Sequence, residues 1–276
     1  MKLTFWGTRG SIAVPGATTL RYGGNTTCLG LEIDGQPPVI LDAGSGIRPL
    51  GLKLAETPGP LEIVLLITHL HWDHLLGFLF FDPVYRPGSR IRLGGWPRGR
   101  DGIRGLFDSQ RSDGHFPVMF SNLPSQVFRD PTILAPEIDL GPARVRTIPL
   151  NHPQGGIGLR FDLDHRSFVF LTDNELGGPG KLQLDDYARF CQGARVLVHD
   201  AQYLPEEMAQ HHGWGHSDWR SVLALAKKAG VEQLILTHHD PNRSDDELDD
   251  ILTEARYEAG PRLQVEAAHE GLSLLI

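Results

Sequence analysis

Six residues that follow an apolar stretch constrain this chain more than any other feature. The segment from His69 to His74 holds three histidines and one aspartate, and imidazole and carboxylate groups are common ligands of metal ions in proteins. The largely apolar residues 61–67 before it have the length and composition of a buried strand, which places the segment at the carboxyl end of that strand. An ordinary polar loop gives no reason for four such groups within six residues, so the sequence predicts a metal site.

The order of the four groups favours two adjacent ions over one. In an extended segment His69 and His71 point to the same side, because side chains alternate along a strand. Asp73 and His74 come at the start of an expected helix that runs to Phe80. The backbone therefore turns between the two pairs, and each pair can approach its own ion.

Further apolar strands also end in acids or histidines. Since ligands in α/β proteins gather where strand ends meet loops, these groups are expected to converge with the first cluster on one edge of a sheet. They are Asp42, Asp173, His199 with Asp200, and His238, and His152 follows the strand that ends at 150.

The length and composition fit one domain with a sizeable core. The chain has 276 residues, 40% of them hydrophobic, and no repeat or linker interrupts it, so we expect a single domain over residues 1–276. The stretch at about 83–131 reads as an irregular, Arg-rich insertion. Between positions 86 and 111 it carries seven arginines and two aspartates, a local charge of +5. Such a run is either a solvated face or a rim that attracts an anionic substrate.

Charge and hydropathy exclude several classes of partner. The net charge of −8 argues against long nucleic acid as the main partner. The longest apolar stretches have about seven residues, against about twenty for a membrane span, so we expect no membrane attachment. The N-terminus lacks the apolar core of a signal peptide. Cys28 and Cys191 form no recognisable pairing pattern, which fits reduced thiols and a cytoplasmic protein.

Four further helices are predicted from periodicity and end signals. The third begins after Ser217, the candidate N-cap, and ends at Gly230. The four helices cover residues 47–56, 185–191, 218–229 and 244–259.

Two tryptophans and two arginines lie near these motifs. Trp72 is expected to point away from the metals and pack, and Trp214 is expected in the core, with stacking on a base as the alternative. Arg9 and Arg21 lie in glycine-rich loops, where each contacts either a phosphate or solvent.

The motif His69-x-His71-x-Asp73-His74, preceded by Asp42, resembles the signature of metallo-β-lactamase-fold hydrolases. The later ligands of that superfamily are matched in order by His152, Asp173 and His238. The resemblance implies an α/β fold, a four-layer αββα sandwich with the metals at one edge of its two sheets.

Three further segments resemble the phosphodiesterase branch of that superfamily, which includes ribonuclease Z and phosphoribosyl cyclic phosphodiesterase. They are Gly7 to Ser11, Gly215-His216-Ser217 and Leu236-Thr237-His238. Ribonuclease Z has His-Glu-Ala-Thr where this chain has His199-Asp200-Ala201-Gln202, and the chain has no clear Gly/Pro-rich arm of the type that grips tRNA. Members of the branch are often dimeric, so a homodimer is implied.

The resemblance implies two divalent ions, zinc first and manganese as the alternative. His69, His71 and His152 would hold one ion, and Asp73, His74 and His238 the other, with Asp173 bridging both. A hydroxide between the ions is the expected nucleophile.

The expected catalytic residues are His216, Asp200 and Asp73. His216 is the candidate acid for the leaving group, held by Asp200, with a capping or packing role as the alternative. Supporting positions around the ligands are expected for Asp42, for His199 behind the site, and for His239 as a supporting or rim group. The remaining histidines are assigned to the entrance (His211 and His212) or to surface or structural roles (His115, His165 and His269).

These assignments predict a phosphodiesterase that acts on a small or cyclic phosphodiester, such as a cyclic nucleotide or cyclic ribose phosphate. The alternatives are a nuclease that processes RNA 3′ ends, a thioester or lactone hydrolase on the same metals, and a non-catalytic binding module.

Overall fold

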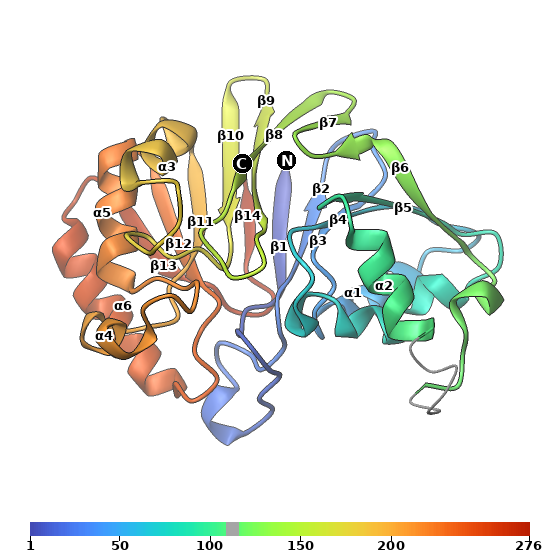
Figure 1. Cartoon of the computed structure of the whole chain (residues 1–276), viewed down its shortest axis with the longest axis horizontal. Helices are drawn as coiled ribbons and strands as arrows, with labels where there is room; N and C mark the ends of the chain where they lie inside the picture. The colour runs from blue at the N-terminus through green and yellow to red at the C-terminus, as the bar shows by residue number, and fades with distance from the viewer. Residues whose placement is uncertain (109–115) are drawn as a thin grey trace.

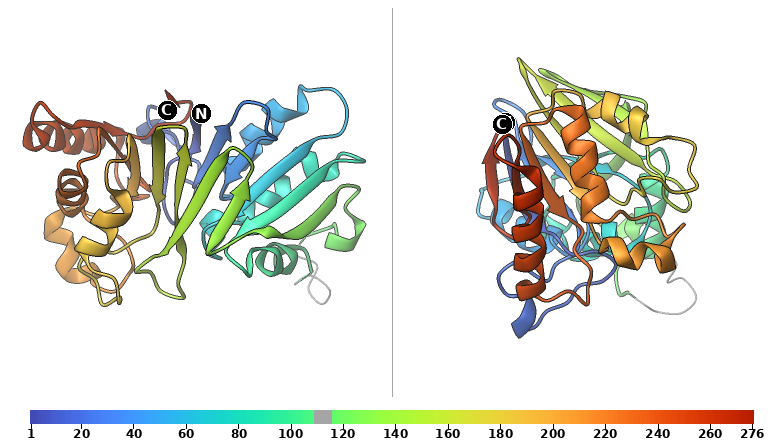
Figure 2. Two further views of the ribbon diagram at one scale, coloured as in Figure 1. Left: turned by 90° about the horizontal axis from the view of Figure 1, so that it is seen from above. Right: turned by 90° about the vertical axis from the view of Figure 1, so that its left-hand side faces the viewer.

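The computed structural model describes residues 1–108 and 116–276, so Arg111 and His115 lie outside the described residues. Two seven-stranded sheets face each other, and helices cover their outer faces (Figures 1 and 2). This is the αββα sandwich that the resemblance implied, and that prediction is confirmed. The N- and C-termini meet in the middle of the molecule, where the Met1 ammonium donates to the Ile276 carbonyl at 3.1 Å.

The two sheets divide the chain into sequential halves, except for the last strand. The first sheet has the order β14 (Ser273–Leu275), β1 (Lys2–Gly7), β2 (Cys28–Glu32), β3 (Val39–Leu41), β4 (Glu62–Ile67), β5 (Arg90–Gly95) and β6 (Gln126–Leu134). The second has the order β13 (Gln264–Ala267), β12 (Gln233–Thr237), β11 (Val196–Asp200), β10 (Arg166–Leu171), β9 (Ile157–Leu163), β8 (Ala143–Pro149) and β7 (Glu137–Leu140).

Parallel pairing brings the functional strand ends together. In the first sheet β3 to β6 are parallel neighbours, and in the second β10 to β13 are. Because parallel strands end at the same edge, the loops after β3 and β4 and those after β10, β11 and β12 can meet at one edge of the sandwich.

Three apolar clusters hold the layers together. The inner faces of both sheets form one of them, with residues such as Phe5, Leu66, Phe168 and Val198. The outer face of the first sheet packs on α1 (Ile47–Ala55) and α2 (Gly99–Asp108). The second packs on α3 (Leu184–Cys191), α5 (Trp219–Ala229) and α6 (Asp245–Ala259), and a short helix α4 (Met208–His211) precedes α5.

The short connections are 3₁₀ turns. They are η1 (Ala17–Thr19), η2 (Trp72–His74), η3 (Leu76–Phe80), η4 (Asp82–Tyr85), η5 (Phe120–Asn122) and η6 (Pro205–Glu207). The predicted helix from Asp73 to Phe80 is therefore wrong: two 3₁₀ turns with a break at Leu75 replace it. No helix in the described part of the chain is long and apolar enough to cross a bilayer.

The stretch at 83–131 is more regular than its sequence pattern indicated. It contains β5, α2 and most of β6, so the expectation of irregular structure is wrong for its described part. The signals were weak because only one residue of β6 is buried and the strand contains Pro131, and because three glycines lower the helix propensity of α2. One of them, Gly102, packs so closely that a Cβ there would lie 2.8 Å from Leu70.

Several arginines of this stretch contact partners of the chain itself. Arg92 pairs with Asp130 at 2.7 Å, and the Arg100 guanidinium lies 5.4 Å from the centre of the Phe120 ring. Arg104 pairs with Asp108 at 2.7 Å. These contacts favour the surface alternative over a rim that attracts substrate.

The predicted N-cap of α5 is displaced by one residue. Asp218, not Ser217, caps the helix, and its carboxylate accepts from the amides of Arg220 and Ser221. The Ser217 hydroxyl is engaged elsewhere, because it donates to the Asn174 carbonyl and accepts from the Leu176 amide. The left-handed Gly230 ends the helix as expected.

Candidate metal centre

Strained backbone concentrates at one edge of the sandwich. Six non-glycine residues of the described part have positive φ, a conformation that costs about 1–3 kcal/mol and persists where the surroundings enforce it. Five of the six lie at the convergence of the predicted site residues: Ser11, Asp42, Gln154, Asp173 and His238. The sixth, Asp164, lies in the turn between β9 and β10.

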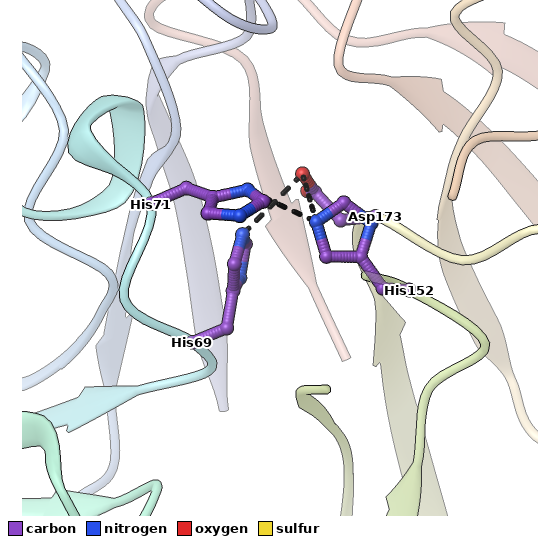
Figure 3. A group of neighbouring side chains, drawn as sticks. All are labelled: His69, His71, His152 and Asp173. Atoms are coloured by element: carbon purple, nitrogen blue, oxygen red, sulfur yellow. Dashed lines mark hydrogen bonds and ion pairs between the residues drawn. The ribbon is translucent and has the colours of Figure 1, made fainter. Parts of the chain in front are cut away.

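The loops after β4, β8 and β10 bring four side chains of the first predicted group together. His69, His71, His152 and Asp173 point toward one another from these loops (Figure 3). The Nδ1 of His71 lies 3.0 Å from the Nε2 of His152, and the Nε2 of His69 lies 3.6 Å from Asp173 Oδ2.

The second predicted group shares Asp173 with the first. Asp173 Oδ1 lies 3.2 Å from the Nε2 of His74 and 3.3 Å from the Nε2 of His238. Asp73 Oδ2 lies 3.4 and 3.2 Å from the same two nitrogens and accepts from the Ser11 amide. Asp173 therefore turns one oxygen toward each group, as a bridging ligand must.

Each of the five imidazoles has its other ring nitrogen engaged outside the cluster. This pattern fixes the tautomer and the ring orientation of metal-bound histidines. The contacts are His69 Nδ1 to Thr68 Oγ1 (3.1 Å), His71 Nε2 to Gln154 Oε1 (2.9 Å), His74 Nδ1 to Asp42 Oδ2 (2.8 Å), His152 Nδ1 to the Gly215 carbonyl (3.0 Å) and His238 Nδ1 to Gln202 Oε1 (3.0 Å).

Asp42 supports two of these rings. It accepts directly from His74, and it also accepts from the hydroxyl and the amide of Thr68 at 2.8 and 2.7 Å. Because the Thr68 hydroxyl donates its proton to Asp42, the hydroxyl oxygen can accept a hydrogen bond from His69. Asp42 thus lies where the sequence analysis expected it, behind the histidines.

Two inward-facing nitrogens are buried without a hydrogen-bond partner among the described residues. They are the Nε2 atoms of His69 and His74, and a buried polar atom without a partner is costly. A cation in each group would give both nitrogens a ligand bond. The donor set of imidazoles and carboxylates suits divalent metal ions, so the residues present fit the implied metals.

The electrostatics of the cluster favour the ligand forms of Asp173 and His152. Burial alone would raise the pKa of Asp173, but the nearby imidazoles of His238, His74 and His69 outweigh it and hold the pKa well below its usual range. Burial lowers the pKa of His152 to about 4. Burial also lowers the pKa of His74, but Asp173, Asp73 and Asp42 outweigh it and raise the pKa well above normal. A bound cation can take the place of that proton.

His216 and Asp200 lie beside the cluster. The Nδ1 of His216 donates to Asp200 Oδ2 at 2.8 Å, and the imidazole stacks on His238 with a centroid distance of 4.9 Å. The Ser217 amide donates to the other oxygen of Asp200 at 3.2 Å. Burial disfavours the charged ring, but the hydrogen bond to Asp200 and the nearby carboxylates outweigh it and raise the pKa of His216.

Two further histidines lie outside both ligand groups. His199 is buried behind Asp200, with its Nδ1 donating to the Asp200 carbonyl and its Nε2 accepting from Asn174, which fits the expected supporting position. His239 is 2% exposed and donates through Nε2 to the Ala268 carbonyl. It is therefore not a rim group, and the rim alternative is wrong.

The loop residues depart from several predictions. Trp72 and Trp214 are 75% and 59% exposed, so neither is packed in the core. Arg9 is fully buried and pairs with Asp245 at 3.2 Å. Arg9 therefore has neither of the roles predicted for it. Arg21 pairs with Asp246 and Asp249 on α6, and its side chain is 54% exposed, which agrees with the solvated alternative.

Sequence reasoning missed most of the partners behind the histidines. Gln202 stands in the segment that departs from ribonuclease Z, and Gln154 lies two residues after His152, but neither position had a role assigned. Glu175 is also buried at the site, where it accepts from the amides of Gly213 and Gly215. Its closeness to Asp173 in sequence was the only signal.

Comparison with known proteins agrees with this geometry. A family model described as "Beta-lactamase superfamily domain" matches residues 38–239. A ribonuclease Z of Halalkalibacterium halodurans is 25% identical over 246 residues, which cover 72% of this chain and 76% of the relative. A ribonuclease BN of Escherichia coli is 27% identical over 309 residues, covering 93% and 94%. The crystal structure of a diphosphatase from the PhnP family superposes with a TM-score of 0.69 at 20% identity, covering 100% of this chain and 97% of the other.

The fold and the cluster define a metal-dependent hydrolase of the metallo-β-lactamase type. Because the family model matches well over half of the sequence, the chain belongs to the beta-lactamase superfamily. The prediction of that superfamily and of its phosphodiesterase branch is confirmed.

Proposed function

We propose that this protein hydrolyses a small or cyclic phosphodiester with two divalent ions. In this proposal His69, His71 and His152 hold one ion. The other is held by Asp73, His74 and His238, and Asp173 bridges the two. Zinc is the favoured metal because imidazoles dominate both groups, and manganese suits the mixed imidazole and carboxylate set as the alternative.

The observation that carries the proposal is the His216–Asp200 pair beside the cluster. When bound, the two ions would supply an activated water and neutralise charge on the phosphoryl oxygens. The chain's own contribution is the proton for the leaving group. The Nδ1–H group of His216 donates a hydrogen bond to Asp200 Oδ2 at 2.8 Å. The Nε2 of His216 has no hydrogen-bond partner among the described residues. Protonated His216 can therefore give the Nε2 proton to a leaving alkoxide, while Asp200 stabilises the charged ring.

The need for an acid favours a phosphodiester over a thioester. An alkoxide is a poor leaving group without a proton, whereas a thiolate leaves readily unaided. The names of the relatives, ribonuclease and diphosphatase, also support a phosphate substrate.

A nuclease that processes RNA 3′ ends is the second candidate. The ribonuclease relatives favour it, at 25% and 27% identity. The net charge of −8 favours a smaller substrate, because long nucleic acid is bound through many phosphate contacts. Binding of RNA that weakens steeply with salt would favour the nuclease, and salt-insensitive binding would speak against it.

The inter-sheet core draws on both halves of the chain, which supports the proposal that residues 1–276 act as one domain. The homodimer and the cytoplasmic location stay predictions.

The test is a panel of model diesters and of 2′,3′- and 3′,5′-cyclic nucleotides, assayed with zinc and with manganese. His216→Ala should lower kcat by about 10²- to 10⁴-fold on the best diester, the range for loss of a general acid, while metal content stays unchanged. His165→Ala, in the exposed turn after β9, is the matched control and should keep full activity. Full activity of His216→Ala would refute the acid role, and a preference of the wild type for thioesters or lactones would refute the proposed substrate class.

A further inference from the structure

An exposed tryptophan stands on a tightly held loop beside the proposed acid. Trp214 is 59% exposed, although it lies two residues before the buried His216. Tryptophan is highly buried on average, so an exposed tryptophan this close in the chain to the proposed acid is a candidate contact for the substrate. The loop joins α4 to α5, and its neighbour Gly215 contacts a proposed metal ligand through its carbonyl, which accepts from His152.

A buried carboxylate holds the backbone on both sides of Trp214. Glu175 is 1% exposed and accepts from the amides of Gly213 and Gly215 at 2.9 Å, as well as pairing with His212 Nδ1 at 3.0 Å. Gly215 has φ of 90°, and a Cβ there would lie 2.1 Å from His152 Nδ1. The loop is therefore fixed against the cluster, and the position of Trp214 is fixed with it.

A row of rings connects His216 to Trp214. Tyr203 contacts His216 edge to face at a centroid distance of 5.9 Å and stacks on His211 at 4.1 Å. His211 in turn meets the Trp214 ring at 5.0 Å and 89°. The row begins at the proposed acid and ends at a ring with a free surface.

Trp72 makes a useful contrast. It is 75% exposed and follows His71 directly, but within residues 1–108 and 116–276 no ring contact supports it. A rigid aromatic surface loses less entropy on binding than a free one, so Trp214 is the better-prepared surface.

We propose that Trp214 stacks on the planar base of a nucleotide substrate whose phosphate lies at the metal cluster. This inference rests on the proposed function and narrows it: the substrate is a nucleotide rather than a sugar phosphate without a base. Stacking of one base on an aromatic side chain is worth about 5- to 150-fold in affinity.

The experiment compares two ligands that differ only in the base. AMP and ribose 5-phosphate are titrated into zinc-loaded wild type, Trp214→Ala and Trp214→Phe by calorimetry. Trp214→Ala should weaken AMP binding by about 5- to 150-fold and leave ribose 5-phosphate binding unchanged, while Trp214→Phe keeps most of the affinity for AMP. Tyr257→Ala removes an 89% exposed ring from α6 and should change neither.

The outcomes distinguish three possibilities: base stacking by Trp214, disruption of the site by the substitution, and failure of the proposed phosphodiesterase activity. Equal loss for both ligands in Trp214→Ala, or loss for neither, overturns the inference. Hydrolysis is then measured on 2′,3′-cyclic AMP and on the 2′,3′-cyclic phosphate of methyl riboside. If the wild type cleaves the methyl riboside phosphate as fast as 2′,3′-cyclic AMP, base stacking by Trp214 is refuted while the proposed phosphodiesterase activity is retained. If it cleaves neither, nor any other diester, the phosphodiesterase fails, and the binding pair still decides whether Trp214 stacks on a base.

Discussion

At the scale of single residues, the orientation of the proposed ligands depends on hydrogen bonds made by ring nitrogens that face away from the metal cluster. Each proposed histidine ligand is oriented by a hydrogen bond from its second ring nitrogen to an acceptor on another residue. These acceptors differ in their access to water. Gln202, behind His238, is 6% exposed, whereas Gln154, behind His71, is exposed. Water can replace the second acceptor but reaches the first poorly, so the two glutamines should differ in importance.

We therefore expect Gln202→Leu to weaken zinc binding by about 10- to 100-fold, the usual effect of losing such an outer partner. Leucine keeps much of the volume but offers no acceptor to His238 Nδ1. Gln154→Leu is the matched variant and should weaken binding less, because solvent can accept from His71. Competition with a zinc chelator of known affinity measures both. A larger effect at Gln154 would contradict the argument from burial.

At the scale of elements, the loop between α4 and α5 contains two glycines with similar backbones and different surroundings. Gly213 and Gly215 have φ of 85° and 90°. A Cβ on Gly213 would meet nothing within 4 Å, whereas one on Gly215 would run into His152 and Pro153. The pair separates the cost of the backbone conformation from the cost of displacing a proposed ligand.

Both Gly213→Ala and Gly215→Ala should lose about 1–2 kcal/mol of stability, because each puts an L-residue in a left-handed conformation. Only Gly215→Ala should also displace His152 and lose one of the two proposed ions. Elemental analysis of the purified variants, with urea unfolding of each, measures the two effects. Equal metal content in the two variants would show that His152 does not depend on this loop.

Elements differ in how well the sequence predicts them. Helices α1, α3, α5 and α6 lie within about two residues of their predicted ends, because apolar periodicity and caps such as Ser244 and Gly230 mark them. β6 and α2 were not predicted, since a strand with one buried residue and an internal proline, and a helix with three glycines, carry weak local signals. Their positions are fixed by tertiary contacts that a local pattern does not record.

The residues of the site likewise differ in how well the sequence predicts them. Its inward-facing groups could be predicted because His and Asp are common metal ligands and stand here at strand ends. Their outer partners could not: the Gly215 carbonyl has no side-chain signal, and Gln202 lies 36 residues from His238. Trp214 was misplaced because tryptophan is buried on average, and only the structure reveals that Glu175 holds the backbone on both sides of it.

At the scale of the whole molecule, the cluster joins the two halves of the sandwich. The first half supplies His69, His71, Asp73 and His74, and the second supplies His152, Asp173 and His238. Without cations, several carboxylates and five imidazoles would crowd one buried edge, so ions bound here should stabilise the folded chain as well as react.

Removal of metal should therefore lower the thermal midpoint. An ion present at 100 times its Kd adds about 2.7 kcal/mol to folding stability, and each kcal/mol shifts the midpoint of a chain near this size by about 2–4 °C. A chelator should thus lower the midpoint by about 5–10 °C for each ion removed. Scanning calorimetry with and without chelator measures this.

A matched pair of aspartates tests whether the shift arises at the bridging position. Asp173 and Asp164 both have positive φ, but only Asp173 lies in the cluster. Asparagine tolerates this backbone region, so Asp173→Asn and Asp164→Asn change charge with little added strain. Asp164→Asn should respond to chelator like the wild type. Asp173→Asn should respond much less, because its ions are already weakly bound. If chelator lowers the thermal midpoints of the two variants equally, the stabilising ions do not depend on Asp173. The link between the two halves of the sandwich would then not run through this residue.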